Sequence, residues 1–162
     1  MSFCNWELLL IDDKPKVPSG KNGWHFSKDV ASLDENGKLR IQGRMDDMIK
    51  CAAESISPCV IEDLLLRHPD VKKVCVVGVP DKRLNEKICA CIILNDGNHS
   101  NKNDGHLETE LNEWCEKKCW VSTLGLPWKP HFYLFVDSFP LTRNGKLSRR
   151  LVREVAASKL GL

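Results

Sequence analysis

The sequence predicts an α+β fold, in which a small mixed or antiparallel sheet is flanked by helices and preceded by a β-hairpin. Three observations lead to this fold class. Asn36-Gly37 separates two runs of alternating apolar and polar residues, which is a strong signal for a hairpin. Apolar runs typical of strands follow at Val71–Val79 and Lys87–Leu94. Segments with helical periodicity precede and follow this pair of runs, so helices are expected to pack on the sheet.

The first elements are two hairpins joined by a charged segment. Phe26–Leu33 and Lys38–Gln42 are expected to pair across the turn at Asn36-Gly37. Arg44–Asp47 then interrupts the alternation, and taken alone such a stretch is a solvated turn. Met48–Ile56 is expected to form a second, shorter hairpin.

A helix is expected directly after the second hairpin. Ser57 suits the cap position and Pro58 the first helical position, where its missing N–H and fixed φ are tolerated. The helical pattern ends near His68-Pro69.

Two more helices and one more strand follow the central pair of strands. A helix over about Leu107–Lys118 places its apolar residues on one stripe. Phe132–Val136 is the third strand of the series. A basic helix that begins at about Leu147 closes the chain, with Leu151 and Val155 expected on its buried side.

The composition excludes several classes of protein. The chain has 162 residues, with 24 Lys and Arg against 22 Asp and Glu and a formal net charge of +2. With 42% hydrophobic residues, it falls in the ordinary globular range rather than the disordered one. A charge this near balance gives no broad field for nucleic acid. No apolar run approaches the roughly 20 residues of a membrane span. No secretion signal is apparent, so the eight cysteines are expected to be reduced thiols of an intracellular protein.

No metal site is expected from the cysteine and histidine spacing. Cys89-x-Cys91 places two thiols on one face of a strand, and Cys115 and Cys119 lie one helical turn apart. Zinc sites usually carry Cys-x₂₋₄-Cys pairs, so the first spacing is too short and the second is at the outer limit. The five histidines are scattered along the chain.

Gly145-Lys146 is the segment most typical of chemistry on phosphates. A phosphate-binding P-loop requires Gly at the position of Pro140 and Ser or Thr at the position of Leu147, so that motif is excluded. Two readings of Lys146 stay open. It is a solvated lysine at a helix start, or an ammonium on a glycine-containing loop that reaches into a neighbouring site.

Six segments form an ordered series with matching spacing: Gly23–Ala31, Gly37–Lys50, Glu54–Glu62, His68–Val71, Val76–Asp81 and Pro140–Lys146. This series, which covers residues 23–162, resembles the C-terminal part of adenylate-forming enzymes, especially the acyl-CoA synthetases. The amino-acid sequence of Glu86–Leu94 is similar to that of the medium-chain, mitochondrial type of acyl-CoA synthetase.

The resemblance implies a ligase that joins a fatty acid to CoA. Such enzymes use ATP with Mg²⁺ to form an acyl-adenylate and pyrophosphate, and CoA then displaces AMP to give acyl-CoA. By position, Lys146 is the catalytic lysine of adenylation and contacts ATP. Asp29 is implied to accept hydrogen bonds from the ribose hydroxyls, and Arg44 to make a second contact with the nucleotide. Asp46 is implied to be the hinge about which the C-terminal lid rotates between the two steps.

Two departures from the family pattern concern glycines. Ala52-Ala53 stands where the family has Gly-Gly, which together with Glu54 is implied to line the CoA tunnel. Ser27-Lys28 stands where the family has Thr-Gly. The extra methyl groups at Ala52 and Ala53 are expected to narrow that tunnel or strain its loop, because glycine allows close approach and positive φ. Restoring glycine there is expected to speed CoA capture.

The resemblance also implies a domain division: an irregular segment 1–22, a hairpin remnant 23–44 of the large AMP-binding domain, and a lid domain 45–162. The large domain, with its phosphate loop and acyl pocket, is implied to be the partner, fused or separate, and the chain is not expected to make acyl-CoA alone. A mitochondrial location is implied by resemblance only. The alternative is a non-catalytic lid that acts as an interaction or regulatory module; Ala52-Ala53 and Lys28 favour it, and the intact Thr142-x-x-Gly145-Lys146 segment opposes it.

Overall fold

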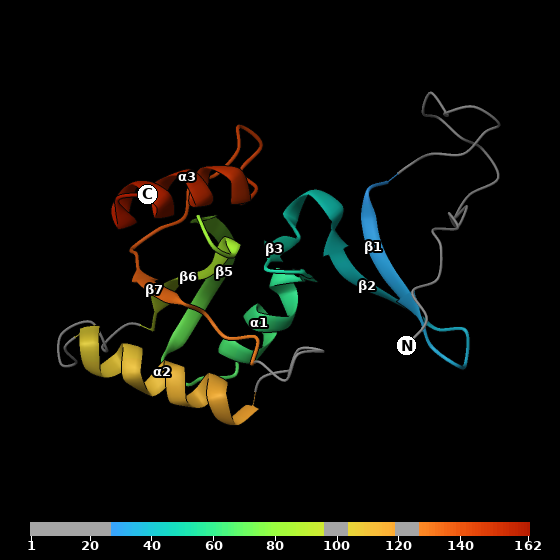
Figure 1. Ribbon diagram of the computed structural model, residues 1–162, viewed down its shortest axis with the longest axis horizontal. Helices are drawn as coiled ribbons and strands as arrows, with labels where there is room; N and C mark the ends of the chain where they lie inside the picture. Colours follow the sequence, from blue (N-terminus) through green and yellow to red (C-terminus); the bar gives the residue numbers. More distant parts are fainter. Residues whose placement is uncertain (1–26, 96–103, 119–126) are drawn as a thin grey trace. The chain divides into compact units, whose positions relative to one another are not determined.

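The computed structural model describes residues 27–95, 104–118 and 127–162 (Figure 1). The irregular segment expected at residues 1–22 lies outside the described residues. The chain divides into two compact units, Met1–Asp46 and Asp47–Leu162. Across the three described ranges, no helix combines the length and apolar character that a bilayer crossing requires.

The described part of the first unit is the expected hairpin. β1 (Asp29–Leu33) and β2 (Leu39–Arg44) pair antiparallel. The turn between them is closed by the Asp34 carboxylate, which accepts hydrogen bonds from the backbone N–H groups of Asn36 and Lys38 at 3.0 and 2.9 Å. Gly37 in this turn has a φ of +76°, a backbone conformation that glycine adopts without strain. Local turn chemistry therefore fixes this hairpin.

The second unit is built on one sheet. A short 3₁₀ helix, η2 (Met45–Asp47), follows β2. The sheet has the order β4-β3-β6-β5, and β7 pairs parallel with β6. The pairs β3–β4 and β5–β6 are antiparallel, so the sheet is mixed as predicted. The strands are β3 (Ile49–Cys51), β4 (Glu54–Ile56), β5 (Val71–Asp81), β6 (Asn85–Leu94) and β7 (Phe132–Phe135).

Three helices cover the two faces of this sheet (Figure 1). α1 (Pro58–Leu65) and α2 (Asp104–Lys118) share one apolar cluster with Val76, Ala90 and their neighbours on the same face. α3 (Arg149–Leu160) covers the other face. Because side chains alternate along a strand, the residues next to Val76 in β5 point to the α3 side. The predicted α+β class, with a hairpin and flanking helices, is confirmed.

The first helix begins as predicted and ends slightly earlier. Pro58 occupies its first turn, and the helix ends at Leu65. The chain then continues through tighter turns, in which the N–H groups of Arg67 and His68 donate to carbonyls three residues earlier at 3.3 and 3.0 Å. The helical pattern in the sequence extends to His68 because these turns follow the same face.

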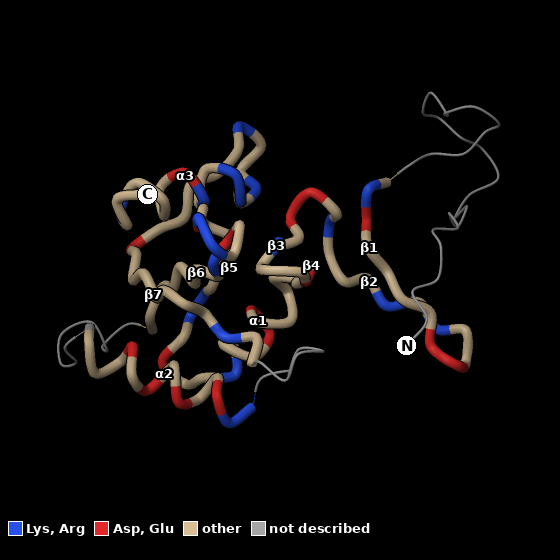
Figure 2. Tube along the Cα trace, in the orientation of Figure 1, with Lys and Arg blue, Asp and Glu red and all other residues tan. Residues whose placement is uncertain are grey.

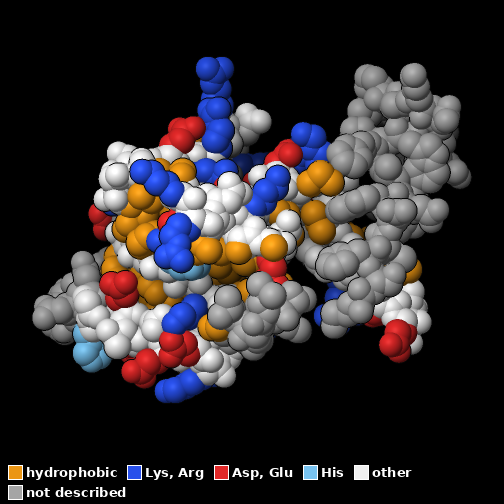
Figure 3. All heavy atoms as spheres, in the orientation of Figure 1, with side chains coloured by type: hydrophobic (Ala, Val, Ile, Leu, Met, Phe, Trp, Pro, Cys, Tyr) orange, Lys and Arg blue, Asp and Glu red, His pale blue; other side chains and the backbone are white. Residues whose placement is uncertain are grey.

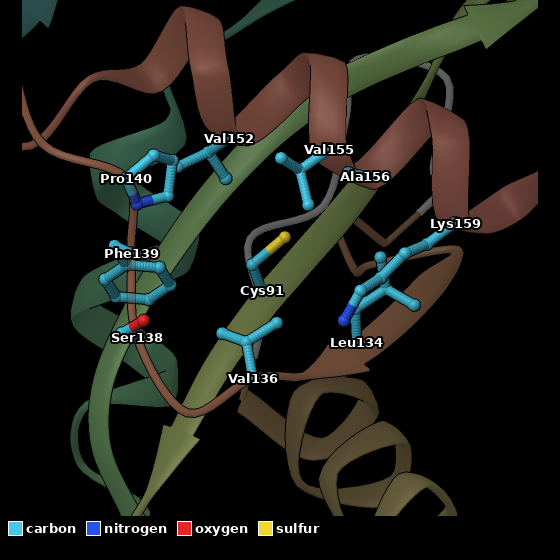
Figure 4. Close-up of a pocket in the computed structure, with 10 residues that line it drawn as sticks. All are labelled: Cys91, Leu134, Val136, Ser138, Phe139, Pro140, Val152, Val155, Ala156 and Lys159. Atoms are coloured by element: carbon cyan, nitrogen blue, oxygen red, sulfur yellow. The ribbon is translucent and has the colours of Figure 1, made fainter.

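The buried face of α3 differs from the prediction. Val152 and Ala156 are buried, whereas Val155, which was expected inside, is 45% exposed and Leu151 is only partly buried. Figure 4 shows Val152 and Ala156 above Cys91 of β6. The cause is Arg149, which precedes Val152 and Ala156 by three and seven residues and therefore lies on the same face. Its contacts fix the rotation of the whole helix.

Arg149 and Glu62 complete the open edge of β5. Glu62 Oε1 accepts the Val76 backbone N–H at 2.7 Å, and Arg149 Nη1 donates to the Val76 carbonyl at 2.9 Å. The two side chains also bind each other bidentately, at 2.5 Å (Nη1–Oε1) and 2.7 Å (Nη2–Oε2). An edge strand presents unpaired backbone groups, and here a mostly buried ion pair from α1 and α3 pairs them. This contact joins both faces of the sheet.

Arg149→Met should lower the free energy of unfolding by about 3 kcal/mol or more, because it leaves the mostly buried Glu62 carboxylate without its cation. Urea unfolding of the 162-residue chain measures this. Arg150→Met is the matched control: the Arg150 side chain is 83% exposed, and its one ion pair within the described residues is with Glu154 of its own helix at 3.7 Å, so a change below about 0.5 kcal/mol is expected. Equal losses for the two variants would contradict the role given to Arg149.

Candidate functional site

Lys146 lies at the end of a tight loop before α3. The motif residues Pro140, Thr142, Gly145 and Lys146 each contribute a contact or a backbone conformation to this loop. Thr142 N–H donates to the Lys146 carbonyl at 2.6 Å, and Lys146 N–H donates to Thr142 Oγ1 at 3.2 Å. Gly145 has a φ of +73° and open space around it, so its backbone conformation rather than close packing requires glycine. The Pro140 carbonyl accepts the Ser148 N–H at 3.1 Å. The loop is thus internally fixed.

This loop and the start of α3 concentrate positive charge. Figure 2 shows Lys and Arg positions gathered along this part of the second unit, and Figure 3 shows Lys and Arg side chains exposed there. Most of these cations have partners: Arg149 binds Glu62, and Arg153 Nη2 lies 3.2 Å from Glu86 Oε1. The exposed Lys146 ammonium forms no ion pair with any side chain of the described segments. Within the described residues, Lys146 and Arg143 are therefore the two cations of this region that are available for an external anion. The gathered cations are Arg143, Lys146, Arg149, Arg150 and Arg153.

Asp29 and Arg44 are brought together in the first unit. They are direct partners in the register of β1 and β2, and Arg44 Nη1 lies 3.9 Å from Asp29 Oδ1. Both side chains are about half exposed, at 56% and 41% for Arg44 and Asp29. A carboxylate acceptor and a guanidinium donor thus stand side by side with room for a polar ligand.

Lys28 pairs with the residue implied to be the hinge. Lys28 Nζ lies 3.0 Å from Asp46 Oδ2, and the Lys28 carbonyl accepts the Met45 N–H at 2.7 Å. Lys28 has a φ of +63°, which is rare for a residue with a side chain. The resemblance described above implies glycine at this position, and the backbone of Lys28 has a conformation that suits glycine.

The two-residue turn between β3 and β4 also has a positive φ at a residue with a side chain. Cys51 pairs with Glu54, and the turn residues are Ala52 and Ala53. Ala52 has a φ of +53°, whereas Ala53 has no positive φ. Hairpin turns with positive φ at the first central position favour glycine there. The structure therefore agrees with the expectation that alanine strains this turn, and places the strain at Ala52.

The turn between β5 and β6 supports this strained turn. Ala52 N–H donates to the Leu84 carbonyl at 2.8 Å, and Glu86 Oε2 accepts the Lys50 N–H at 2.7 Å. Glu86 fits because it lies against Gly78, where an added Cβ would come within 2.8 Å of its carboxyl carbon. Asp81 in turn fixes the supporting turn. Two hairpin ends are thereby held together.

Glu54 has a partner that local sequence reasoning missed. Trp128 Nε1 donates to Glu54 Oε2 at 2.9 Å, across 74 residues of sequence. Trp128 precedes β7 and packs against the apolar cluster beside Cys51. The sequence analysis did not connect the two, since no local spacing relates them. Thr142, by contrast, was already visible in the motif.

The predicted residues fall into two groups. Asp29, Arg44 and Asp46 belong to the first unit, and Asp46 is its last residue. Lys146 and the Ala52-Ala53 turn belong to the second unit. Within the first unit, the structure brings Asp29 and Arg44 together.

One group of potential metal ligands exists within the described residues: His68, Asp70 and Glu110. His68 Nδ1 accepts the Asp70 N–H at 3.3 Å, so the ring proton of the neutral imidazole is on Nε2. Nε2 lies 3.7 Å from Glu110 Oε1. A protonated nitrogen offers no lone pair to a metal, so this arrangement favours a polar contact between α2 and the segment after α1.

The described cysteines are free thiols. Cys75, Cys89 and Cys91 are buried beneath α3. Burial raises the pKa of Cys75 to about 12, so its thiol stays protonated at neutral pH. A small hollow beside Cys91 is lined mainly by apolar side chains such as Phe139 and Val136 (Figure 4). This cluster fits a packing role.

The sheet, its helices and the loop of Lys146 define a small α+β domain with a cationic loop. Residues 60–146, more than half of the chain, match the sequence model of the AMP-binding enzyme C-terminal domain. The chain belongs to this family.

Individual relatives are adenylate-forming ligases. The chain is 38% identical over 143 residues to the mitochondrial medium-chain acyl-CoA ligase ACSF2 of Rattus norvegicus. The aligned segment covers 88% of this chain and 22% of that protein. Among solved structures, it is similar to the anthranilate CoA ligase AuaEII in complex with anthranoyl-AMP, with a TM-score of 0.72 and 28% identity. The match covers 89% of this chain and 26% of AuaEII. It is also similar to o-succinylbenzoate CoA synthetase (MenE) of Bacillus subtilis, with a TM-score of 0.65 and 27% identity. That match covers 83% of this chain and 25% of MenE. The chain thus spans about a quarter or less of the length of these proteins.

Ala52→Gly should raise the free energy of unfolding by up to about 1 kcal/mol, because it relieves the left-handed strain at φ +53° by more than it adds chain entropy to the unfolded state. Ala53→Gly is the matched control, and it should lose about 0.4–1 kcal/mol because no strain is relieved there. Urea unfolding of both variants measures the difference. Losses of the same size in both would contradict strain at Ala52.

Acid should weaken the turn that supports Ala52. Hydrogen bonds from Lys87 Nζ and from the N–H groups of Leu84 and Arg83 lower the pKa of Asp81 from 3.8 to about 2. A lowered pKa in the folded state stabilises the fold above about pH 4, and this contribution is lost as the pH falls toward 2.

The stability difference between the parent chain and Asp81→Asn should therefore shrink between pH 5 and pH 2 in unfolding measurements. Lys87→Met is the control background: without the hydrogen bond from Lys87 Nζ, which lies 2.9 Å from Asp81 Oδ2, the same Asp81→Asn difference should depend less on pH. A pH-independent difference in the parent background would contradict the role of Asp81.

Proposed function

We propose that this chain is the C-terminal lid of an ATP-dependent acyl-CoA synthetase and supplies the lysine of adenylation. The observation that carries the proposal is the Lys146 loop. Its backbone is fixed by its own motif residues, and its ammonium is exposed among cations whose charges are mostly paired. Membership of the AMP-binding enzyme C-terminal domain family supports this assignment.

The chemistry explains why a cation is needed. In adenylation, an oxygen of the acid's carboxylate attacks the α-phosphorus of ATP, and the bond from that phosphorus to the bridging oxygen breaks to release pyrophosphate. Two anions must approach each other, and negative charge builds on the phosphoryl oxygens. A positioned ammonium stabilises that charge more in the transition state than in the separated reactants. Lys146 is proposed to do this.

Asp29 and Arg44 are proposed to hold the nucleotide. An ionised carboxylate accepts hydrogen bonds from two adjacent ribose hydroxyls, and Arg44 beside it donates to a neighbouring polar group. Their 3.9 Å separation supports this proposal, because both can contact one ligand. The Mg²⁺ expected with ATP is assigned to no residue of the described segments.

The second step is proposed to use the β3–β4 turn. The CoA thiol attacks the acyl carbon of the adenylate, the bond from that carbon to the AMP oxygen breaks, and the thiol proton is lost. Ala52, Ala53 and Glu54 are proposed to line the channel that admits CoA. Asp46 is proposed as the hinge for the rotation between the steps, and its place at the end of the first unit supports this.

The substrate, location and partner follow from the relatives and are proposals. The name of the rat relative specifies a medium-chain acyl-CoA ligase of mitochondria. We therefore propose a fatty acid as the carboxylic acid, a mitochondrial location, and an N-terminal adenylation domain, fused or separate, as partner. The alternative of a non-catalytic module is not favoured, because the matched relatives carry this segment within ligases.

Lys146→Ala should lower the rate of acyl-adenylate formation by about 10²–10³-fold, the effect typical of losing one stabilising donor at a developing charge. The assay is fatty-acid-dependent exchange of pyrophosphate into ATP, after the chain is combined with the N-terminal part of a relative such as rat ACSF2. The reaction of CoA with preformed acyl-adenylate should be nearly unchanged, because the lysine acts in the first step.

Arg143→Ala is the matched control, since it removes a cation from the same loop without removing Lys146. Its adenylation rate should stay within about three-fold of the parent, in line with the weak effect of an exposed charge. An unchanged rate in Lys146→Ala, or an equal loss in Arg143→Ala, would contradict the proposed function.

A further inference from the structure

Two consecutive aspartates lie at the boundary between the compact units. Asp46 is the last residue of the first unit and Asp47 is the first residue of the second. Each binds a cation of its own unit. Lys28 Nζ lies 3.0 Å from Asp46 Oδ2, and Arg149 Nε lies 3.7 Å from Asp47 Oδ2. Neighbouring side chains are thus anchored to different bodies.

We propose that Lys28 and Arg149 are positioning residues that confine the hinge to the single linkage between Asp46 and Asp47. The proposal deepens the hinge role of Asp46 and rests on the proposed function in that respect. A hinge absorbs its rotation in the few residues that neither body restrains. With Asp46 anchored on one side and Asp47 on the other, the torsions that lie between the two anchors are the ψ of Asp46 and the φ of Asp47, within the short 3₁₀ helix η2.

Both anchors are themselves fixed. On the first side, the Lys28 carbonyl also accepts the Met45 N–H at 2.7 Å, so one residue holds the chain through backbone and side chain. On the second side, the Arg149 guanidinium is held by Glu62 and by the Val76 carbonyl at the edge of β5. Asp47 therefore binds a group that cannot follow the motion of the first unit.

The unusual backbone of Lys28 is a second, independent observation. Its φ of +63° suits glycine, and a side chain there is unfavourable. Strained residues persist where the surrounding structure fixes them, and they cluster at switches and functional sites. At this position the side chain that causes the strain is also the one that binds Asp46.

The two anchors differ in strength. The Lys28 and Asp46 side chains are 49% and 60% exposed, whereas those of Arg149 and Asp47 are 22% and 30% exposed. Salt screens exposed pairs more than buried ones. The Asp46 anchor should therefore release first, and the Asp47 anchor should persist through the motion.

Amide and guanidinium hydrogen exchange, measured by NMR on the 162-residue chain, tests both anchors. Lys28→Met should raise the exchange rate of the Met45 amide by about two- to five-fold, as expected for an exposed ion pair. Asp47→Asn should raise the exchange rate of the Arg149 Nε–H and leave the Met45 amide unchanged. At about 1 M NaCl, the parent Met45 amide should approach the Lys28→Met rate, while the Arg149 Nε–H should change less.

Two matched controls change a charge on the same elements without touching the anchors. Lys38 lies in the exposed turn of the same hairpin, and Asp63 lies on the exposed side of α1. Neither Lys38→Met nor Asp63→Asn should alter the exchange rates of the Met45 amide and the Arg149 Nε–H. Unchanged Met45 exchange in Lys28→Met overturns the proposal. So does a Lys28→Met variant in which the Arg149 Nε–H exchanges faster, because the anchors would then not be separate. The measurement needs no catalysis, so a failure of the Lys146 assay leaves its result interpretable.

Discussion

The guanidinium of Arg149 is the contact on which most of this structure depends. It pairs the open edge of β5 at Val76, binds Glu62 of α1 from the other face of the sheet, and contacts Asp47 at the start of the second unit. Because a mostly buried guanidinium and carboxylate are stable only together, none of these elements can shift alone. The rotation of α3, with Val152 and Ala156 inward, follows from the same contact. So does the placement of the Lys146 loop, which ends where α3 begins.

Strain in the two units is found where the family pattern has glycine. Lys28 and Ala52 adopt positive φ although both carry side chains. In each case specific contacts hold the backbone: Met45 bonds to the Lys28 carbonyl, and the Leu84 carbonyl binds Ala52. Both segments therefore have a backbone conformation that suits glycine at a position occupied by lysine or alanine.

What could be predicted from the sequence depends on the range of the interactions. The first hairpin, the start of α1 at Pro58 and the loop of Lys146 were predictable, because turn and cap chemistry acts within a few residues. The inward face of α3 was not, because apolar residues occur on both sides of that helix and a polar residue, Arg149, selects the buried one. Nor were the contacts of Glu54 with Trp128 and of Lys28 with Asp46, since they join distant segments. The sequence located the candidate residues, and tertiary contacts determined their partners.

The second unit carries both of its candidate segments on one rigid frame. The Lys146 loop is continuous with α3, which is fixed to β5 through Arg149, and the Ala52 turn is fixed to the end of the β5–β6 hairpin through Leu84 and Glu86. Since both are fixed to the same pair of strands, neither can be moved toward a reacting group without moving the other. A lid that uses the lysine in one step and the turn in another must therefore move as a body. The proposed hinge between Asp46 and Asp47, each of which binds a cation of its own unit, would supply that motion.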